Sequence, residues 1–111
     1  PILKREDGLI DWSLYAFAIE RRVRGLQPWP NAHTTFGSHR LIIWSALPEW
    51  IEQLRFPAGQ VIEASRDRLI VACGDGTALR LLEVQAQDSR RMSARDFLNG
   101  VQLRVGTKLG E

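Results

Sequence analysis

HTTFGSHRLIIWSA, residues 33–46, is the stretch of this sequence that decides the fold. Apolar and polar side chains alternate with a period of two on both sides of Gly37-Ser38, which is the pattern of two strands joined by a tight turn. Gln27-Pro28-Trp29-Pro30 lies just before it and ends any helix, because proline lacks an amide donor and restricts the preceding residue. We therefore expect a β-hairpin over residues 33–46 and mainly β structure after the two prolines.

Further short strands follow the hairpin. We expect them at residues 60–65, 69–73 and 78–85, separated by turns at Arg66-Asp67-Arg68 and Gly74-Asp75-Gly76. Residues 48–57 are expected to be a connector. About five short strands with turns between them fit a small OB-like (Greek-key) barrel, and a closed barrel leaves no exposed sheet edge.

Two helices are expected beside the strands. The first covers residues 13–24 and is capped by Asp11 or Ser13, whose side-chain oxygens can accept from free amides at a helix start. Gly25 follows it, where a left-handed residue is often needed. Its apolar positions recur at helical spacing, and we expect them to face the core: Leu14, Phe17, Ala18 and Val23.

The second helix is short and lies near the C-terminus, at residues 94–98. Ser93 is its expected cap, and Asn99-Gly100 ends it. Residues 1–10 mix charges with a glycine and predict an extended interdomain linker. The last residues carry Gly106 and Gly110, so we expect a loose tail. The fold class is thus mainly β, with one N-terminal helix and a short C-terminal helix.

Composition places the chain among ordinary globular domains. It has 111 residues, of which 44% are hydrophobic and 25% charged, and this argues against disorder and against a fibrous repeat. No apolar run approaches the roughly 20 residues that a membrane helix needs. Cys73 is the one cysteine, so an internal disulfide and a cysteine-rich zinc site are excluded, and a reducing cytoplasmic location is expected.

No catalytic residue and no metal site are predicted. Cys73 lies in the apolar run LIVAC and is expected to pack in the core. His33 and His39 flank a turn, are expected to be solvated, and lack a third ligand at a recognisable spacing. Glu6-Asp7, and Glu49 with Glu52, are expected to be solvated charges, because acid–base catalysis needs an enclosed site. Gly74-Asp75-Gly76 lacks the Lys-Ser/Thr of a phosphate loop and is expected to be a turn.

The tryptophans have different expected roles. Trp12 precedes the first helix and can pack back against it. Trp44 lies in a strand with apolar neighbours and is expected in the core. Trp29 stands between two prolines, where it could be a stacking platform for a base or a plug that seals the helix against the barrel. We favour the plug.

The basic residues are mostly arginine. The net charge is only +2, but thirteen of the fifteen cations are Arg, which suits bidentate contact with phosphate. A GC-rich genome produces the same bias, so both explanations stay open. Residues 88–108 hold five cations against two aspartates. This local excess fits a surface that follows a phosphate backbone, or a solvated face that keeps the domain soluble.

Five segments together resemble the C-terminal domain of methionyl-tRNA formyltransferases. They occur in the order and spacing of that family and span nearly the whole chain: DGLIDWS (7–13), RVRGLQPWP (22–30), CGDG (73–76), RMSARDFLNG (91–100) and GTKLG (106–110). Residues 47–56, LPEWIEQLRF, match no string of the family and are a candidate lineage-specific loop.

The resemblance implies a role in translation initiation. Enzymes of that family transfer a formyl group from 10-formyltetrahydrofolate to the methionine of initiator Met-tRNA. Their catalysis belongs to an N-terminal Rossmann-like domain, the expected partner of residues 11–111, so no catalytic residue can be assigned in this chain. The C-terminal domain is an OB-like barrel that helps hold the tRNA. The chain by itself is then expected to be inactive.

Basic surface residues are the candidates for tRNA contact. They are Lys4, Arg5, Arg21, Arg22, Arg24, Arg90, Arg91 and Lys108. Two alternatives stay open. The chain could be a structural domain of another 10-formyltetrahydrofolate-using formyltransferase with no tRNA role, or an interaction domain whose basic residues are incidental.

Overall fold

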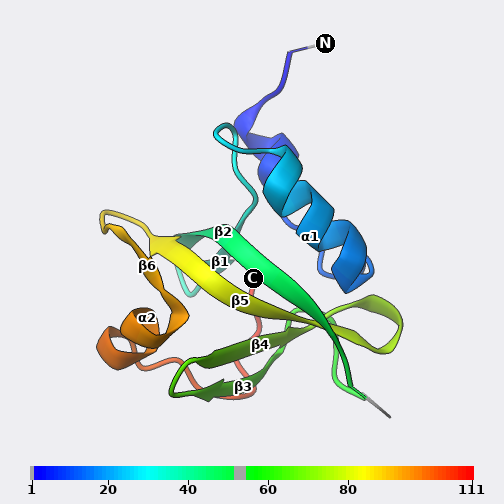
Figure 1. Ribbon diagram of the computed structural model, residues 1–111, viewed down its shortest axis with the longest axis vertical. Coiled ribbons are helices and arrows are strands. Elements are labelled where there is room, and N and C mark those ends of the chain that lie inside the picture. The colour runs from blue at the N-terminus through cyan, green and yellow to red at the C-terminus, as the bar shows by residue number, and fades with distance from the viewer. Residues whose placement is uncertain (1, 52–54) are drawn as a thin grey trace.

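The computed structural model describes residues 2–51 and 55–111. Six strands form one antiparallel sheet, two α-helices flank it, and two single-turn 3-10 helices, η1 and η2, lie before α1 and between β4 and β5 (Figure 1). The elements in chain order are η1 (Arg5–Gly8), α1 (Ala16–Gly25), β1 (His33–Phe36), β2 (His39–Trp50), β3 (Val61–Ser65), β4 (Arg68–Ala72), η2 (Gly74–Gly76), β5 (Thr77–Ala86), β6 (Arg91–Ser93) and α2 (Ala94–Gly100).

The expected mainly β fold is confirmed, and so is the hairpin that the sequence predicts around Gly37-Ser38. The strand order is β1-β2-β5-β4-β3, and β6 also pairs with β5. Two strand predictions are corrected. β2 continues through Pro48 to Trp50, where a connector was expected, because it pairs with β5 along this whole length. β6 was missed, since it has only three residues. Glu52 and the middle of the candidate 47–56 loop lie outside the described residues.

The two ends of this strand order are joined by the C-terminal tail and not by a strand ladder. Within the described strands β1 does not pair with β3, so the expected closed barrel is not confirmed. Instead the Gly110 amide donates to the Thr35 carbonyl of β1, and the Leu109 amide donates to the Gly59 carbonyl just before β3, both at 2.8 Å. Leu109 is buried. The expected loose tail is therefore wrong, because both sheet edges bind it.

α1 begins later than predicted, at Ala16, because its cap comes from a distant strand. The Asp11 carboxylate accepts from the Ser13 amide at 3.0 Å and so closes a local turn rather than the helix. The Ala16 amide donates instead to the hydroxyl Oγ1 of Thr77 on β5, at 2.9 Å. Gly25 ends the helix with ordinary helical geometry, since it is absent from the residues with positive φ.

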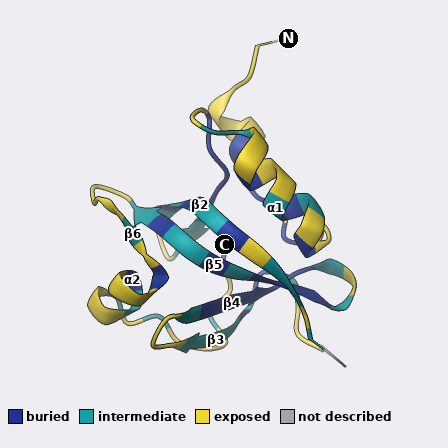
Figure 2. Ribbon diagram, viewed as in Figure 1, coloured by how far each residue is buried: buried dark blue, intermediate teal, exposed yellow. Residues whose placement is uncertain are grey.

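The buried face of α1 also differs from the prediction. Ala16, Ile19 and Val23 are buried against the sheet, whereas Phe17 is 46% exposed. Figure 2 shows exposed residues along the outer side of the helix. The apolar pattern alone placed Leu14 and Phe17 inside, but Leu14 precedes α1 and Phe17 lies on its outer side.

Trp12 fills the space between the two edges of the sheet. It is 6% exposed, and its Nε1–H donates to Thr34 Oγ1 at 3.0 Å. Its ring lies beside Gly59 and Gly110, so it touches the segments that join β1 and β3. The predicted plug, Trp29, is 53% exposed, so that prediction is wrong.

The remaining elements agree more closely with the sequence. Ser93 caps α2, because its Oγ accepts from the Asp96 amide at 3.1 Å, although the helix continues to Gly100. Phe97 is buried under it. Residues 1–10 are not extended throughout: η1 forms, and the Ile10 amide donates to the His33 carbonyl at 2.8 Å. None of the described helices has the length and apolar character to cross a membrane.

Candidate nucleic-acid interface

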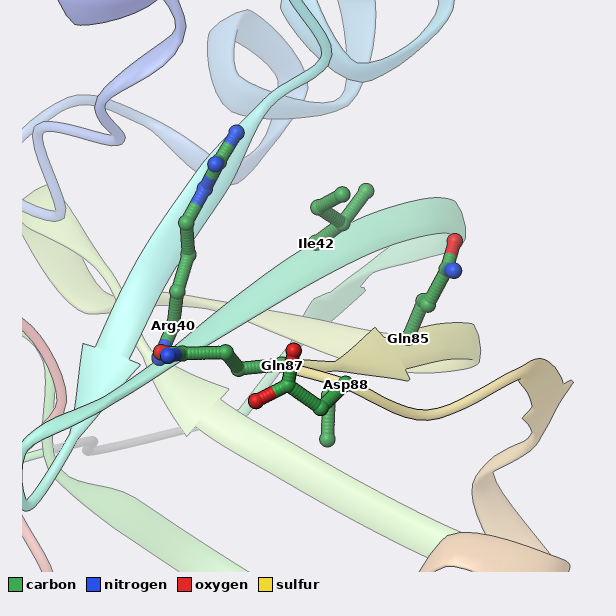
Figure 3. Close-up of a pocket in the computed structure, with 6 residues that line it drawn as sticks. Arg40, Ile42, Gln85, Gln87 and Asp88 are labelled. Atoms are coloured by element: carbon green, nitrogen blue, oxygen red, sulfur yellow. The ribbon is translucent and has the colours of Figure 1, made fainter.

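A hollow of about 240 Å³ lies on the outer face of β2 and β5, where β2 begins and β5 ends. Ile42 and Ala86 are its apolar lining residues, and Ile42 lies between Arg40 and Gln85 in Figure 3. Ile42 and Gln85 are register partners across the two strands, which explains why they share a face. Gln87 and Asp88, from the turn after β5, complete the hollow. A lining of apolar and polar side chains together suits a ligand of mixed polarity.

Trp44 and Arg91 form a stacked pair next to this hollow. The Arg91 guanidinium carbon lies 4.7 Å from the centre of the Trp44 ring, a cation–π distance. Arg91 also pairs with Glu83 at 2.7 Å, and Trp44 Nε1–H donates to Gln85 Oε1 at 2.9 Å. The expectation that Trp44 lies in the core is wrong: it is half-buried and holds an arginine at the surface.

Arg40 places another guanidinium at the hollow. Its Nε is buried and has no hydrogen-bond partner among the described residues. His33 lies nearby on β1 and is buried, not solvated as expected. Burial lowers the pKa of His33 below its usual value of 6.5. The hydrogen bond to the Asn31 carbonyl opposes this shift, and the charges of Arg40 and Arg5 add to it. The charges of Arg40, at the hollow, and of Arg5, before it in the chain, thus both act on His33.

The C-terminal half of α1 lies beside the same surface. Gln27 Nε2 donates to the Trp44 carbonyl at 2.7 Å, which holds the end of the helix against β2. Arg22 donates to the Asp7 carbonyl, which holds η1 against the helix. Arg24 pairs with Glu20 at 2.6 Å, while Arg21 is exposed and forms no ion pair with any described carboxylate.

We call this surface the basic face. We assign to it seven of the eight predicted tRNA-contact residues, with Arg40 and Trp44, which the sequence prediction missed: Lys4, Arg5, Arg21, Arg22, Arg24, Arg40, Trp44, Arg90 and Arg91. The contacts that the structure shows among them and their neighbours join Arg91 to Trp44 beside the hollow and Arg22 of α1 to η1. The sequence prediction relied on cations that are close together along the chain. Arg40 has no such neighbour, so it was not selected. Lys108 lies elsewhere: its backbone bridges Gln60 beside β3, and its side chain is 3.6 Å from Glu111.

The structure offers no enclosed reactive group on the basic face. Cys73 is buried as predicted, and burial raises the pKa of its thiol to about 12, so it stays protonated. Over residues 2–51 and 55–111 no three His, Cys, Asp or Glu side chains gather as metal ligands would. The guanidinium groups of Arg40 and Arg91 at this surface are suited to binding an anionic partner.

Comparison with known proteins gives consistent matches. Residues 2–102 match the family described as formyl transferase, C-terminal domain. Methionyl-tRNA formyltransferase of Solibacter usitatus is 50% identical over 111 residues, which is 100% of this chain and 34% of that protein. The protein of the same name in Bacillus subtilis (strain 168) is 37% identical over 110 residues, covering 99% of this chain and 34% of the relative. The chain thus spans about a third of the length of these relatives.

A solved structure has the same fold at lower identity. HypX from Aquifex aeolicus, in complex with tetrahydrofolic acid, superposes with a TM-score of 0.67 at 18% identity. The match covers 86% of this chain and 17% of that one. At this identity the likeness concerns the fold alone.

Proposed function

This chain belongs to the formyl transferase C-terminal domain family, and we propose that it is the tRNA-holding part of a methionyl-tRNA formyltransferase. In this proposal the basic face contacts the phosphate backbone of initiator Met-tRNA. A preceding catalytic domain, which uses 10-formyltetrahydrofolate, formylates the methionine for translation initiation in the cytoplasm. Residues 1–10 link that domain to residues 11–111.

The observation that carries the proposal is the Trp44–Arg91 stack next to the hollow that Arg40 lines. Phosphates are neutralised by Arg and Lys without regard to base sequence, so such a surface positions a tRNA but does not select it. The OB-like description belongs to the proposal as well. Its support is the tail that connects both sheet edges, which gives the open sheet a barrel-like outline.

Salt-dependent binding tests this function. The 111-residue chain should bind initiator and elongator tRNA with similar affinity, and log K should fall linearly with log salt concentration, with a slope of about 0.7–0.9 for each neutralised phosphate. The double variant Arg21→Gln/Arg90→Gln should lower the slope by about two, because both side chains are exposed and make no ion pair with a described carboxylate.

The matched control removes the same charge away from the basic face. Arg55→Gln/Arg104→Gln changes two exposed arginines outside it and should leave the slope unchanged. Absence of tRNA binding near 50 mM salt would contradict the proposal and favour a structural domain without a tRNA role. Formyl transfer by the isolated chain would contradict the assignment of catalysis to a separate domain.

A further inference from the structure

A second hollow, of about 410 Å³, lies between α2 and the β3–β4 turn. It is lined by Arg66, Asp67, Arg95 and Asn99. β3 and β4 are at the other end of the strand order from β1 and β2, so this hollow and the basic face are built from different elements (Figure 1). None of its lining residues belongs to the predicted tRNA-contact set.

The backbone at Arg66 is unusual for an arginine. Its φ is +60°, and the other non-glycine residues with positive φ are Asn31, Asp75 and Asp88. Asn and Asp tolerate this left-handed region because their short side chains hydrogen-bond locally, whereas Arg has no such compensation. The position is the first of a short hairpin turn, where glycine relieves the strain. An arginine held in such a conformation suggests a role for its side chain.

The charges around the hollow leave two guanidinium groups available. The Asp67 carboxylate accepts from Arg80 at 3.4 Å. Neither Arg66 nor Arg95 pairs with any carboxylate in the part of the chain that the structure describes. Asn99 lies one turn after Arg95 on α2, so the two side chains project from the same side of the helix. The hollow thus presents two cations and an amide donor, beside the Asp67 carboxylate, whose charge is offset by Arg80.

We propose that this hollow binds a phosphate group, with the Arg66 and Arg95 guanidiniums donating to its oxygens and the Asn99 amide donating a further hydrogen bond. Arginine suits this ligand because its planar fork matches two phosphate oxygens at once. The phosphate can come from a nucleic-acid backbone or from a small phosphorylated molecule. Only the first source rests on the proposed tRNA function.

The substitution Arg66→Gly should change phosphate affinity and thermal stability in opposite directions. It removes the guanidinium and also relieves the left-handed backbone, so Tm should rise by several degrees while affinity for inorganic phosphate falls about ten-fold or more. Arg95→Gln should lower phosphate affinity similarly without raising Tm. The matched control Arg104→Gln, which changes an exposed arginine outside both the basic face and this hollow, should leave phosphate affinity unchanged. Binding is measured by NMR, by following the backbone amide resonances of residues 66, 95 and 99 during a titration with inorganic phosphate.

The outcomes distinguish the sources of the phosphate. If Arg66→Gly weakens both phosphate and tRNA binding, the ligand is a tRNA phosphate; if it weakens phosphate binding alone, the ligand is a small phosphorylated molecule. Absence of saturable phosphate binding by the unmodified chain, or equal phosphate affinity in Arg66→Gly, overturns the proposal. If the unmodified chain binds phosphate at this hollow but no tRNA, the proposed tRNA function fails and the phosphate site stands.

Discussion

Trp12 and Trp29 precede and follow α1, and the fold uses them in opposite ways. Trp12 is buried between the sheet edges, with its indole N–H bonded to Thr34. Trp29 projects into solvent from the turn after the helix, while the next residue, Pro30, is buried. Both residues stand in motifs that resemble the same family. Neither the residue type nor the position in a family motif therefore predicts which of the two tryptophans is buried in the core.

The difference comes from what lies around each ring. Trp12 meets two glycines, Gly59 and Gly110, whose lack of side chains leaves room for an indole. Its polar atom also finds a hydroxyl partner, which a buried tryptophan requires. Trp29 is followed by Pro30, whose buried ring fixes the turn, so the indole itself does not need to be buried. The exposed ring of Trp29 is therefore not needed to fill the core.

The largest expected effect is on the two tryptophans themselves. Trp12→Ala should lower the free energy of unfolding by about 3–5 kcal/mol, because it opens a cavity between the sheet edges. Trp29→Ala should change it by less than about 0.5 kcal/mol. Urea unfolding measures both. Since Trp12→Ala could prevent folding, Trp12→Phe serves as a second variant and should cost about 1 kcal/mol for the lost hydrogen bond. If Trp12→Phe and Trp29→Phe lower the free energy of unfolding equally, the two tryptophans do not differ in their contribution to stability.

Two glycines, Gly74 near Trp12 and Gly25 near Trp29, extend the comparison of the two tryptophans. A Cβ built on Gly74 would collide with the Ser13 carbonyl, close to Trp12, whereas a Cβ on Gly25, near the Trp29 turn, meets nothing. We expect Gly74→Ala to destabilise the domain by about 1–3 kcal/mol. Gly25→Ala should stabilise it by about 0.5–1 kcal/mol, since alanine is the better helix residue there. Thermal unfolding monitored by circular dichroism reports both shifts. A neutral Gly74→Ala would show that the packing around Ser13 is loose.

The smallest effect concerns the start of α1. Thr77→Val keeps the shape of the side chain but leaves the Ala16 amide without its acceptor, and should cost about 1–2 kcal/mol. Ser13→Ala, at the position that sequence rules favour as a cap, should change stability by less than about 0.5 kcal/mol. Chemical denaturation of the two variants compares them directly. The opposite ranking would mean that the local turn, and not β5, starts the helix.

Much of the fold was predictable because it depends on neighbours along the chain. The β1–β2 hairpin, the β3–β4 hairpin and the Ser93 cap follow from alternation, turn residues and side-chain oxygens within a few positions. The errors occur where a distant segment intervenes. The late start of α1 requires Thr77, and the ordered tail requires the free edges of β1 and β3.

The candidate site shows the same division. Most residues assigned to the basic face are those that the sequence predicts for tRNA contact, because arginines cluster in the sequence. Arg40 and Trp44 were missed, because what brings them there is the register of β2 against β5 and the stack with Arg91. Lys108 was grouped with the C-terminal cations by sequence proximity, yet its backbone pairs beside β3.

The sequence by itself determined the mainly β class, the turns and the family of the chain, since these are written in short-range patterns and motif strings. The tertiary structure decided which tryptophan is buried, what caps α1, how the sheet edges are joined and which arginine stacks on Trp44. The physical reason is that burial and hydrogen-bond partners depend on which distant segments face each other. Short-range patterns specify the segments but not those pairings.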